Sequence, residues 1–244
     1  MHIGVAWGRH GADPVDAYFG NATFLPGQRA QPMRLRHWFH GMTTEGRRVE
    51  VMIDSVNTEA EHGEAALHVR VRGTHLDSAE TALFWDTNDA LTVLPSGPAR
   101  LDSAAADLLK DRARVLHRAA LADTGAVPTH NTVAFATPDV RGVEAMPDVV
   151  TVYYPMMLKQ GDSTVDDRAN AFFLYSIPGR RVLFETFGHP EWGPRADKVV
   201  SVSTTAFFRI SGDPHTYLLA LRLGAWESPG SWVIFDLATG KRLL

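Results

Sequence analysis

Short runs of alternating apolar and polar residues, separated by turn-forming residues, constrain the fold of this chain most. The clearest run covers residues 65–72, where a leucine and two valines occupy one set of alternate positions and a histidine and two arginines the other. Side chains with this period of two point to opposite faces of a β-strand. The run therefore predicts a strand with one buried and one wet face.

Similar runs extend along the rest of the chain. Residues 1–33 contain closely spaced Gly and Pro, which predict a wrapping arm with one short strand. We expect three hairpins, formed by 34–40 with 47–54, by 81–86 with 90–94, and by 171–177 with 181–187 across Pro178-Gly179. Further strands are predicted at 132–136, 149–154, 199–210, 216–223 and 231–237.

One segment, residues 102–122, has helical spacing instead. Its apolar positions include Leu108, Leu109, Val115 and Leu116, which recur every three or four residues. Asp102 or Ser103 can cap its start, and Gly125 follows its end. We predict one amphipathic helix that packs against a sheet.

Many short strands and one helix indicate a mainly β protein. The predicted architecture is a lipocalin-like antiparallel barrel or two packed antiparallel sheets. Two arrangements of domains fit a chain of 244 residues. Either residues 1–125 form an N-terminal β half with the helix and 126–244 a C-terminal β-meander half, or the chain is one continuous domain.

Composition excludes several classes of function. The net charge of −4 gives no footprint for nucleic acid, which needs clustered Lys and Arg. The absence of cysteine excludes disulfides, thiolate catalysis and cysteine-held metals. No run has the ~18 apolar residues of a membrane helix, and the first residues lack the pattern of a secretory signal. We expect a cytoplasmic protein.

The densest group of chemically useful side chains lies between residues 185 and 194. It contains Glu185, His189, Glu191 and Trp192, held between Gly and Pro residues. A strand over 181–187 would place Glu185 on a face with Leu183 and Phe187, and burial without a partner raises the pKa of a carboxyl group, as a general acid or base requires. A neighbouring glutamate can orient an imidazole for proton transfer. The alternative is a structural turn in which His189 caps backbone groups.

Two other motifs admit a functional and a structural interpretation. Trp38 and His40 share a strand face, which suits a cavity wall or ordinary core packing. Residues 161–170 resemble the nucleophile block of GDSL esterases, but that block belongs near the start of an α/β chain and here lies late in a β-rich one. We therefore interpret Asp162, Asp166 and Asp167 as a solvated loop.

Residues 188–195, Gly-His-Pro-Glu-Trp-Gly-Pro-Arg, resemble the Asp-His-x-Trp-Gly motif of the lipocalin-like superfamily of carotenoid 1,2-hydratases, natural-product cyclases and Diels–Alderases. His37-Trp-Phe39 is similar to the Trp-Trp-Tyr segment near the start of those proteins. This chain departs from the pattern in two places, since His189-Pro-Glu191 replaces the Asp-His order and Phe39 the second tryptophan.

The resemblance implies a protein that binds an apolar small molecule in a barrel cavity. It also implies cyclisation, isomerisation or hydration of that molecule in natural-product biosynthesis, by a cyclase, isomerase or hydratase-type lyase without cofactor or metal. The alternative is a non-catalytic carrier or a β-rich interaction domain, and the sequence does not show the oligomeric state. The residues expected at the site are Glu185, His189 and Glu191 for catalysis, and Trp38, His40, Trp85, Tyr154 and Trp192 for substrate binding.

Overall fold

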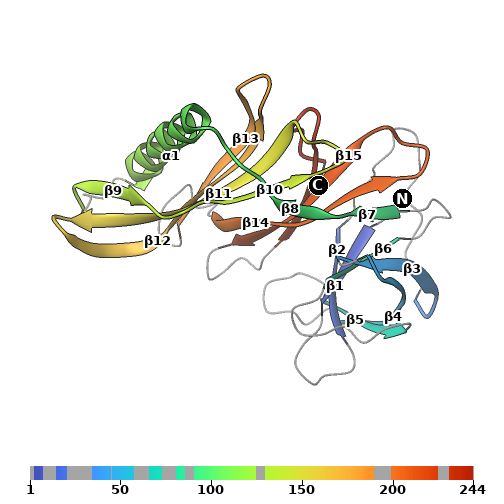
Figure 1. The fold of residues 1–244 in the computed structure, drawn as a ribbon. Coiled ribbons are helices and arrows are strands. Elements are labelled where there is room, and N and C mark those ends of the chain that lie inside the picture. The colour runs from blue at the N-terminus through green and yellow to red at the C-terminus, as the bar shows by residue number, and fades with distance from the viewer. Residues whose placement is uncertain are drawn as a thin grey trace.

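The fold is mainly β, with antiparallel sheets and one helix in the part that the structure describes (Figure 1). The structure is a computed structural model that describes residues 3–7, 15–20, 35–44, 46–57, 66–72, 81–85, 91–124, 130–189, 199–224 and 231–243. The antiparallel sheets confirm the predicted mainly β fold class.

Six strands pair in a closed cycle, here called the small barrel. In pairing order they are β1 (Ile3–Trp7), β2 (Val15–Gly20), β5 (Ala66–Arg72), β4 (Arg48–Asn57), β3 (Trp38–Thr43) and β6 (Thr81–Trp85). A cycle of six strands is smaller than the eight-stranded barrel of lipocalins. The likeness to that superfamily therefore stays a prediction.

The inside of the small barrel is closely packed around Gly41. Phe39 and Gly41 are buried on alternate positions of β3, and the rings of Phe39 and Phe84 lie 6.1 Å apart, centroid to centroid. A Cβ atom at Gly41 would lie 2.8 Å from Val49 Cγ2 and 3.0 Å from the Leu83 carbonyl oxygen. Real Cβ atoms almost never approach other atoms so closely, which explains a glycine here.

The remaining strands form two open antiparallel sheets. The six-stranded sheet contains β13 (Arg181–Gly188), β12 (Ser163–Ser176), β11 (Val149–Gln160), β10 (Asp139–Val143) and β8 (Ser96–Pro98) in that order, and β9 (Thr132–Phe135) also pairs with β11. The four-stranded sheet contains β16 (Ser231–Asp236), β15 (Thr216–Gly224), β14 (Val199–Ile210) and β7 (Leu91–Leu94).

These elements stack in layers, from α1 (Ser103–Thr124) through the six-stranded and four-stranded sheets to the small barrel (Figure 1). On β12, Phe173 packs in the core beneath α1, whereas Phe172 packs against the four-stranded sheet. On β14, Phe207 meets the six-stranded sheet, whereas Phe208 packs with Trp85 of the small barrel. Both open sheets are thus covered on their two faces, which explains the nearly continuous apolar runs of their central strands.

The helix begins where the sequence predicts. Asp102 accepts a hydrogen bond at Oδ1 from the Ala105 backbone N–H, 2.6 Å away, which satisfies one of the amides at the helix start. Leu109 and Ala113 are fully buried against the six-stranded sheet. A membrane-crossing helix needs about 20 mostly apolar residues, and no helix in the described part of the chain meets that requirement.

Strand pairing confirms two of the predicted hairpins and corrects the third. β3 pairs with β4, and β12 pairs with β13 across the turn at 177–180. The hairpin of 81–86 with 90–94 is wrong, because β6 pairs with β1 and β3 of the small barrel, whereas β7 pairs with β14. Apolar alternation fixes which face of a strand is buried, but it does not specify the neighbouring strand.

Two segments contain more strand than predicted. Strand pairing also crosses the boundary near residue 125 that was predicted between the two halves of the chain. Residues 1–33 include two described strands, β1 and β2, where one was expected. β12 begins at Ser163 instead of near 171. Before the boundary, β7 and β8 pair with β14 and β10, which follow it.

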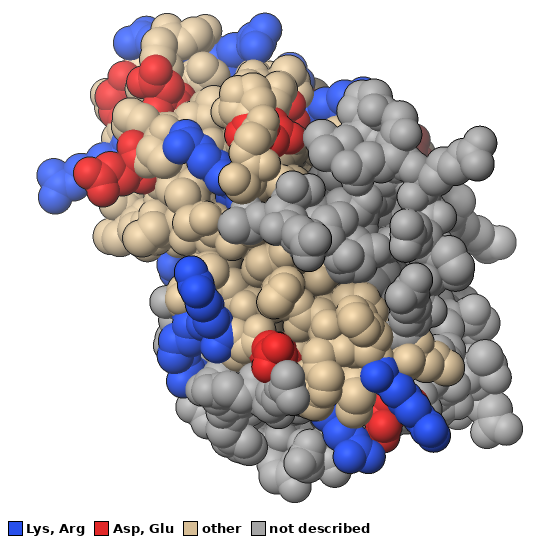
Figure 2. All heavy atoms as spheres, turned by 90° about the vertical axis from the view of Figure 1, so that its right-hand side faces the viewer, with Lys and Arg blue, Asp and Glu red and all other residues tan. Residues whose placement is uncertain are grey.

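Charges of both signs lie close together on the surface. In the view of Figure 2, acidic side chains lie beside basic ones at both ends of the described part of that face. This mixture accords with the small net charge of −4.

Candidate functional site

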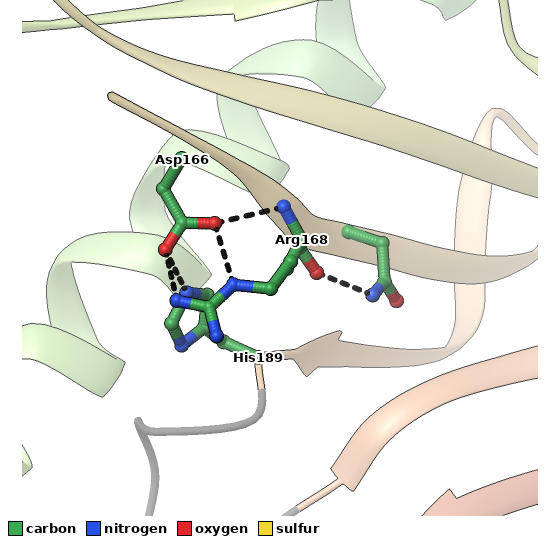
Figure 3. Close-up of polar contacts among 4 residues, drawn as sticks. Asp166, Arg168 and His189 are labelled. Atoms are coloured by element: carbon green, nitrogen blue, oxygen red, sulfur yellow. Dashed lines mark hydrogen bonds and ion pairs between the residues drawn. The ribbon is translucent and has the colours of Figure 1, made fainter. Parts of the chain in front are cut away.

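A buried histidine and a carboxylate meet where β13 ends. His189 directly follows β13, its side chain is fully buried, and its Nε2 lies 3.1 Å from Oδ2 of Asp166 on β12 (Figure 3). The antiparallel pairing of Asn170 with Gly188 brings the two segments together. We call these two side chains the Asp166–His189 pair.

Arg168 holds the charge of Asp166. Its Nε and Nη2 atoms donate to Asp166 Oδ1 and Oδ2 at 3.1 and 2.7 Å, and its backbone N–H donates to Oδ1 at 2.9 Å (Figure 3). The pairing of β12 with β11 is irregular between Asp166 and Ala169, and at this irregularity the backbone N–H and the side chain of Arg168 both reach the Asp166 carboxylate. Hydrogen bonds from Arg168, with a smaller contribution from His189, hold the pKa of Asp166 far below its usual range. Asp166 is therefore ionised at neutral pH.

The ionised carboxylate fixes the tautomer of His189. An ionised carboxylate can only accept hydrogen bonds, so Nε2 of His189 must carry the proton that Asp166 Oδ2 accepts. In the neutral ring, Nδ1 then carries the lone pair. The pair has the arrangement in which a carboxylate orients an imidazole and stabilises its protonated form.

Two further histidines lie near the pair. His117 of α1 and His130, which precedes β9, are both buried, and their ring centroids lie 4.9 Å apart. The ring of Phe187 lies 5.7 Å from that of His117. Burial, followed by the neighbouring His130 and His189, lowers the pKa of His117 to about 4, and burial also lowers the pKa of His130. These rings are neutral at pH 7.

The cluster is not arranged as a metal centre. In the described ranges of the chain, no three His, Asp or Glu side chains are placed so that they could hold a metal ion. A neutral imidazole cluster beside an ionised carboxylate is suited instead to accepting or passing on a proton.

Glu185 has a partner that the sequence did not indicate. Both of its carboxylate oxygens accept hydrogen bonds from the guanidinium of Arg112 on α1. Arg112 Nε donates to Oε2 at 3.0 Å, and Arg112 Nη2 donates to Oε1. The hydrogen bond with Glu185 raises the pKa of Arg112. The prediction for Glu185 rested on burial without a partner, and this ion pair removes that condition.

The prediction that Glu185 shares a strand face with Leu183 and Phe187 is also partly wrong. Phe187 packs beneath α1, as expected for the face of Glu185, but Leu183 packs toward the four-stranded sheet. The cause is an irregularity in the pairing of β12 with β13, between Leu174 and Tyr175, which shifts the alternation of β13 at this point.

The predicted substrate-binding residues divide between two places. His40 pairs directly with Trp85, and Trp38 lies two residues from His40 on the same outer face of the small barrel. Trp85 is buried against the four-stranded sheet, whereas His40 is exposed. Tyr154 is buried beneath α1, where its hydroxyl donates to the Ala106 carbonyl oxygen at 3.5 Å. Glu191 and Trp192 lie outside the described residues.

Sequence reasoning missed four members of the site. Asp166 was expected in a solvated loop, but it lies on a strand with its side chain only 14% exposed, whereas Asp162 and Asp167 are exposed. Arg168, His117 and His130 were not singled out. The spacing of Asp166 and Arg168 gave no signal by itself, because they come together at an irregularity in the pairing of β12 with β11, which the sequence does not show.

Comparison of the chain with protein-family models, with curated proteins and with solved structures found no match.

Proposed function

We propose that this protein is an enzyme that binds an apolar small molecule beside the Asp166–His189 pair and transfers a proton to or from it. The reaction class is cyclisation, isomerisation or hydration, as the sequence resemblance implies. The observation that supports the proposal is the contact of 3.1 Å between Nε2 of the fully buried His189 and the ionised Asp166.

The chemistry of such substrates requires a group of this kind. Hydration of a double bond adds a proton to one carbon, and isomerisation removes a proton from one carbon and returns it to another. A positioned imidazole accelerates these proton transfers by about 10²–10⁴-fold. In this proposal the imidazole of His189 takes up or releases the proton, and Asp166 stabilises the positive charge that the ring then carries.

The proposal puts the site at the end of β13 and not inside the small barrel. Of the predicted catalytic residues, Glu185 and His189 both lie along β13 or directly after it. Around Gly41 the inside of the small barrel leaves no room even for a Cβ atom. In this proposal Glu185 has a positioning role, because its ion pair with Arg112 holds α1, and with it His117, over β13.

The test is incubation of the purified protein with extracted polyenes or polyketide-derived compounds in D₂O, followed by separation and mass measurement. We expect an isomeric or hydrated product that has gained deuterium, because the proton passes through an exchangeable group. A compound that binds and is recovered unchanged would show a carrier instead. Failure of all compounds to bind would refute the proposed function.

Two variants connect turnover to the site. His189→Gln keeps a donor near Asp166 but removes the imidazole that transfers the proton, so we expect turnover to fall by about 10²-fold or more. The matched control is Asp139→Asn, since Asp139 binds Arg141 with the same two-residue spacing on the same sheet, and among the described residues no histidine binds this carboxylate. Equal turnover of His189→Gln and wild type would exclude His189 from the reaction.

A further inference from the structure

A second carboxylate–histidine pair lies on the four-stranded sheet. His215 directly precedes β15, and its Nδ1 lies 2.7 Å from Oδ2 of Asp236, the last residue of β16. Asp236 pairs with Tyr217 across the sheet, so Asp236, Tyr217 and His215 share one face. Asp236 is buried, with 8% of its surface exposed, whereas the His215 side chain is 45% exposed.

The tight turn after β16 fixes the carboxylate of Asp236. Oδ1 accepts a hydrogen bond from the Ala238 backbone N–H at 2.8 Å, which leaves Oδ2 for His215. The Asp236 backbone N–H donates to the Lys241 carbonyl oxygen at 3.0 Å, and Gly240 closes the turn with φ of 69°. The acceptor of the pair is thus held by the backbone and not by a flexible side chain.

The imidazole of His215 is held from its other sides by Tyr217 and Asp213. Its ring stacks on the ring of Tyr217, with centroids 6.2 Å apart and planes inclined by 21°. The Tyr217 hydroxyl donates to Asp213 Oδ2 at 2.6 Å, and Asp213 Oδ1 accepts from the His215 backbone N–H at 2.9 Å. Burial and the bond to Asp213 raise the pKa of Tyr217 well above its usual value, so the hydroxyl keeps its proton.

This arrangement fixes the tautomer of His215, whose side chain is about half exposed. When Asp236 is ionised it can only accept a hydrogen bond, so Nδ1 carries the proton and Nε2 carries the lone pair of the neutral ring. An imidazole base that is oriented by a carboxylate in this way is common to many hydrolytic catalytic centres. His189 has the opposite tautomer and is fully buried, so the two pairs are suited to different substrates.

We propose that His215 is a second catalytic centre, a general base that activates water against small carboxylic esters from solution. Nε2 accepts a proton from a water molecule as the water oxygen bonds to the acyl carbon. The bond from that carbon to the leaving oxygen then breaks, and this oxygen departs with the electron pair, as phenolate or, from an alkyl ester, as the alcohol after it takes a proton from solvent. Asp236 stabilises the imidazolium that forms, which loses its proton to solvent.

The test is hydrolysis of p-nitrophenyl acetate by the full chain, followed as release of p-nitrophenolate. We expect His215→Gln to lower the second-order rate constant by about 10²-fold, the lower end of the range for a positioned base. The matched control is His37→Gln, because His37 is also exposed and its ring packs edge-on against Phe39. That variant should hydrolyse the ester at the wild-type rate.

Asp236→Asn tests the orientation of the ring. If the buried carboxylate organises the base, this variant should lose at least about tenfold in rate, and wild-type hydrolysis should be slower in D₂O because a proton moves in the rate-limiting step. A rate for His215→Gln equal to that of wild type would refute the proposal. A full rate in Asp236→Asn, with the loss confined to His215→Gln, would show an ordinary surface imidazole and would refute it too. Neither result bears on His189.

Discussion

The imidazole rings of His117 and His130 lie 4.9 Å apart in the core between α1 and the six-stranded sheet. Only 4% of His117 and 8% of His130 is exposed to solvent. Burial disfavours the protonated form of both rings, and for His117 repulsion from His130 adds to this effect, so both rings are neutral at pH 7. The groups that face His117 are His130, His189 and Arg118, and Asp166 faces His130.

The neutral histidine cluster makes the protein less stable in mild acid. The pKa of His117 is lowered to about 4 in the folded chain, against 6.5 in the unfolded chain. The unfolded state therefore binds more protons between these values, and stability falls as the pH drops from about 6.5 toward 4. From pH 7.5 to 5.0 we expect His117 to cost about 2 kcal/mol of unfolding free energy.

The measurement is urea unfolding at both pH values for wild type and His117→Gln. The variant should lose less stability than the wild type over this interval, even if its stability at pH 7.5 is lower. The same loss in both proteins would contradict a neutral His117. Exposed His37, replaced by Gln, serves as the control and should not change the difference between the two pH values.

The sequence predicted the elements better than their arrangement. The helix, β9 and the strands β13 to β16 were predicted within a few residues, because apolar spacing reports directly which side of an element is buried. β11 and β12 are longer than predicted, and β10 was not predicted. The strand pairing of the small barrel was not predicted, because β6 pairs with β1 and β3, which lie in distant parts of the chain. Nothing in the alternation of residues 81–85 specifies those partners.

The site was predicted in part for the same reason. His189 was singled out from its place after a strand, but its carboxylate partner was expected among nearby glutamates. The partner is Asp166, on the neighbouring strand. Glu185 pairs with Arg112 from α1. Contacts between residues far apart in sequence depend on strand register and helix docking, which a single sequence does not reveal.

A glycine in the C-terminal turn permits close contact with β13. Gly240 has φ of 69°, and a Cβ atom there would lie 2.6 Å from the Leu183 carbonyl oxygen. Gly240→Ala should therefore lower the unfolding free energy by about 2–4 kcal/mol, through backbone strain and a clash with main chain. Gly46→Ala is the control, because Gly46 has φ of 84° but nothing within 4 Å of the added atom. It should cost only about 1–2 kcal/mol, and equal losses in urea unfolding would contradict the close contact.

The Arg112–Glu185 ion pair should contribute modestly to stability. Glu185 is 20% exposed and Arg112 is 47% exposed, so solvent screens much of their attraction. We expect Glu185→Gln to lower the unfolding free energy by about 0.5–1 kcal/mol. Asp139→Asn removes a more exposed ion pair, with Arg141, and should have a smaller effect. A larger loss in Asp139→Asn, measured by urea unfolding, would show that the contact of α1 with β13 does not depend on this pair.

Arg168 should stabilise the folded protein against acid unfolding at pH values below those at which His117 titrates. The guanidinium lowers the pKa of Asp166, so this carboxylate contributes stability that is complete above the unfolded value of about 3.9 and is lost as the pH falls below it. In Arg168→Gln that contribution is smaller, and we expect acid unfolding, followed by circular dichroism, to begin at a higher pH than in wild type. Arg141→Gln removes the corresponding arginine beside Asp139, where no histidine is bound and both side chains are about half exposed, and should leave the acid transition in place. If the acid transition moves equally in the two variants, the loss of any surface arginine has this effect. Arg168 would then have no specific role in keeping Asp166 ionised, on which the tautomer of His189 depends.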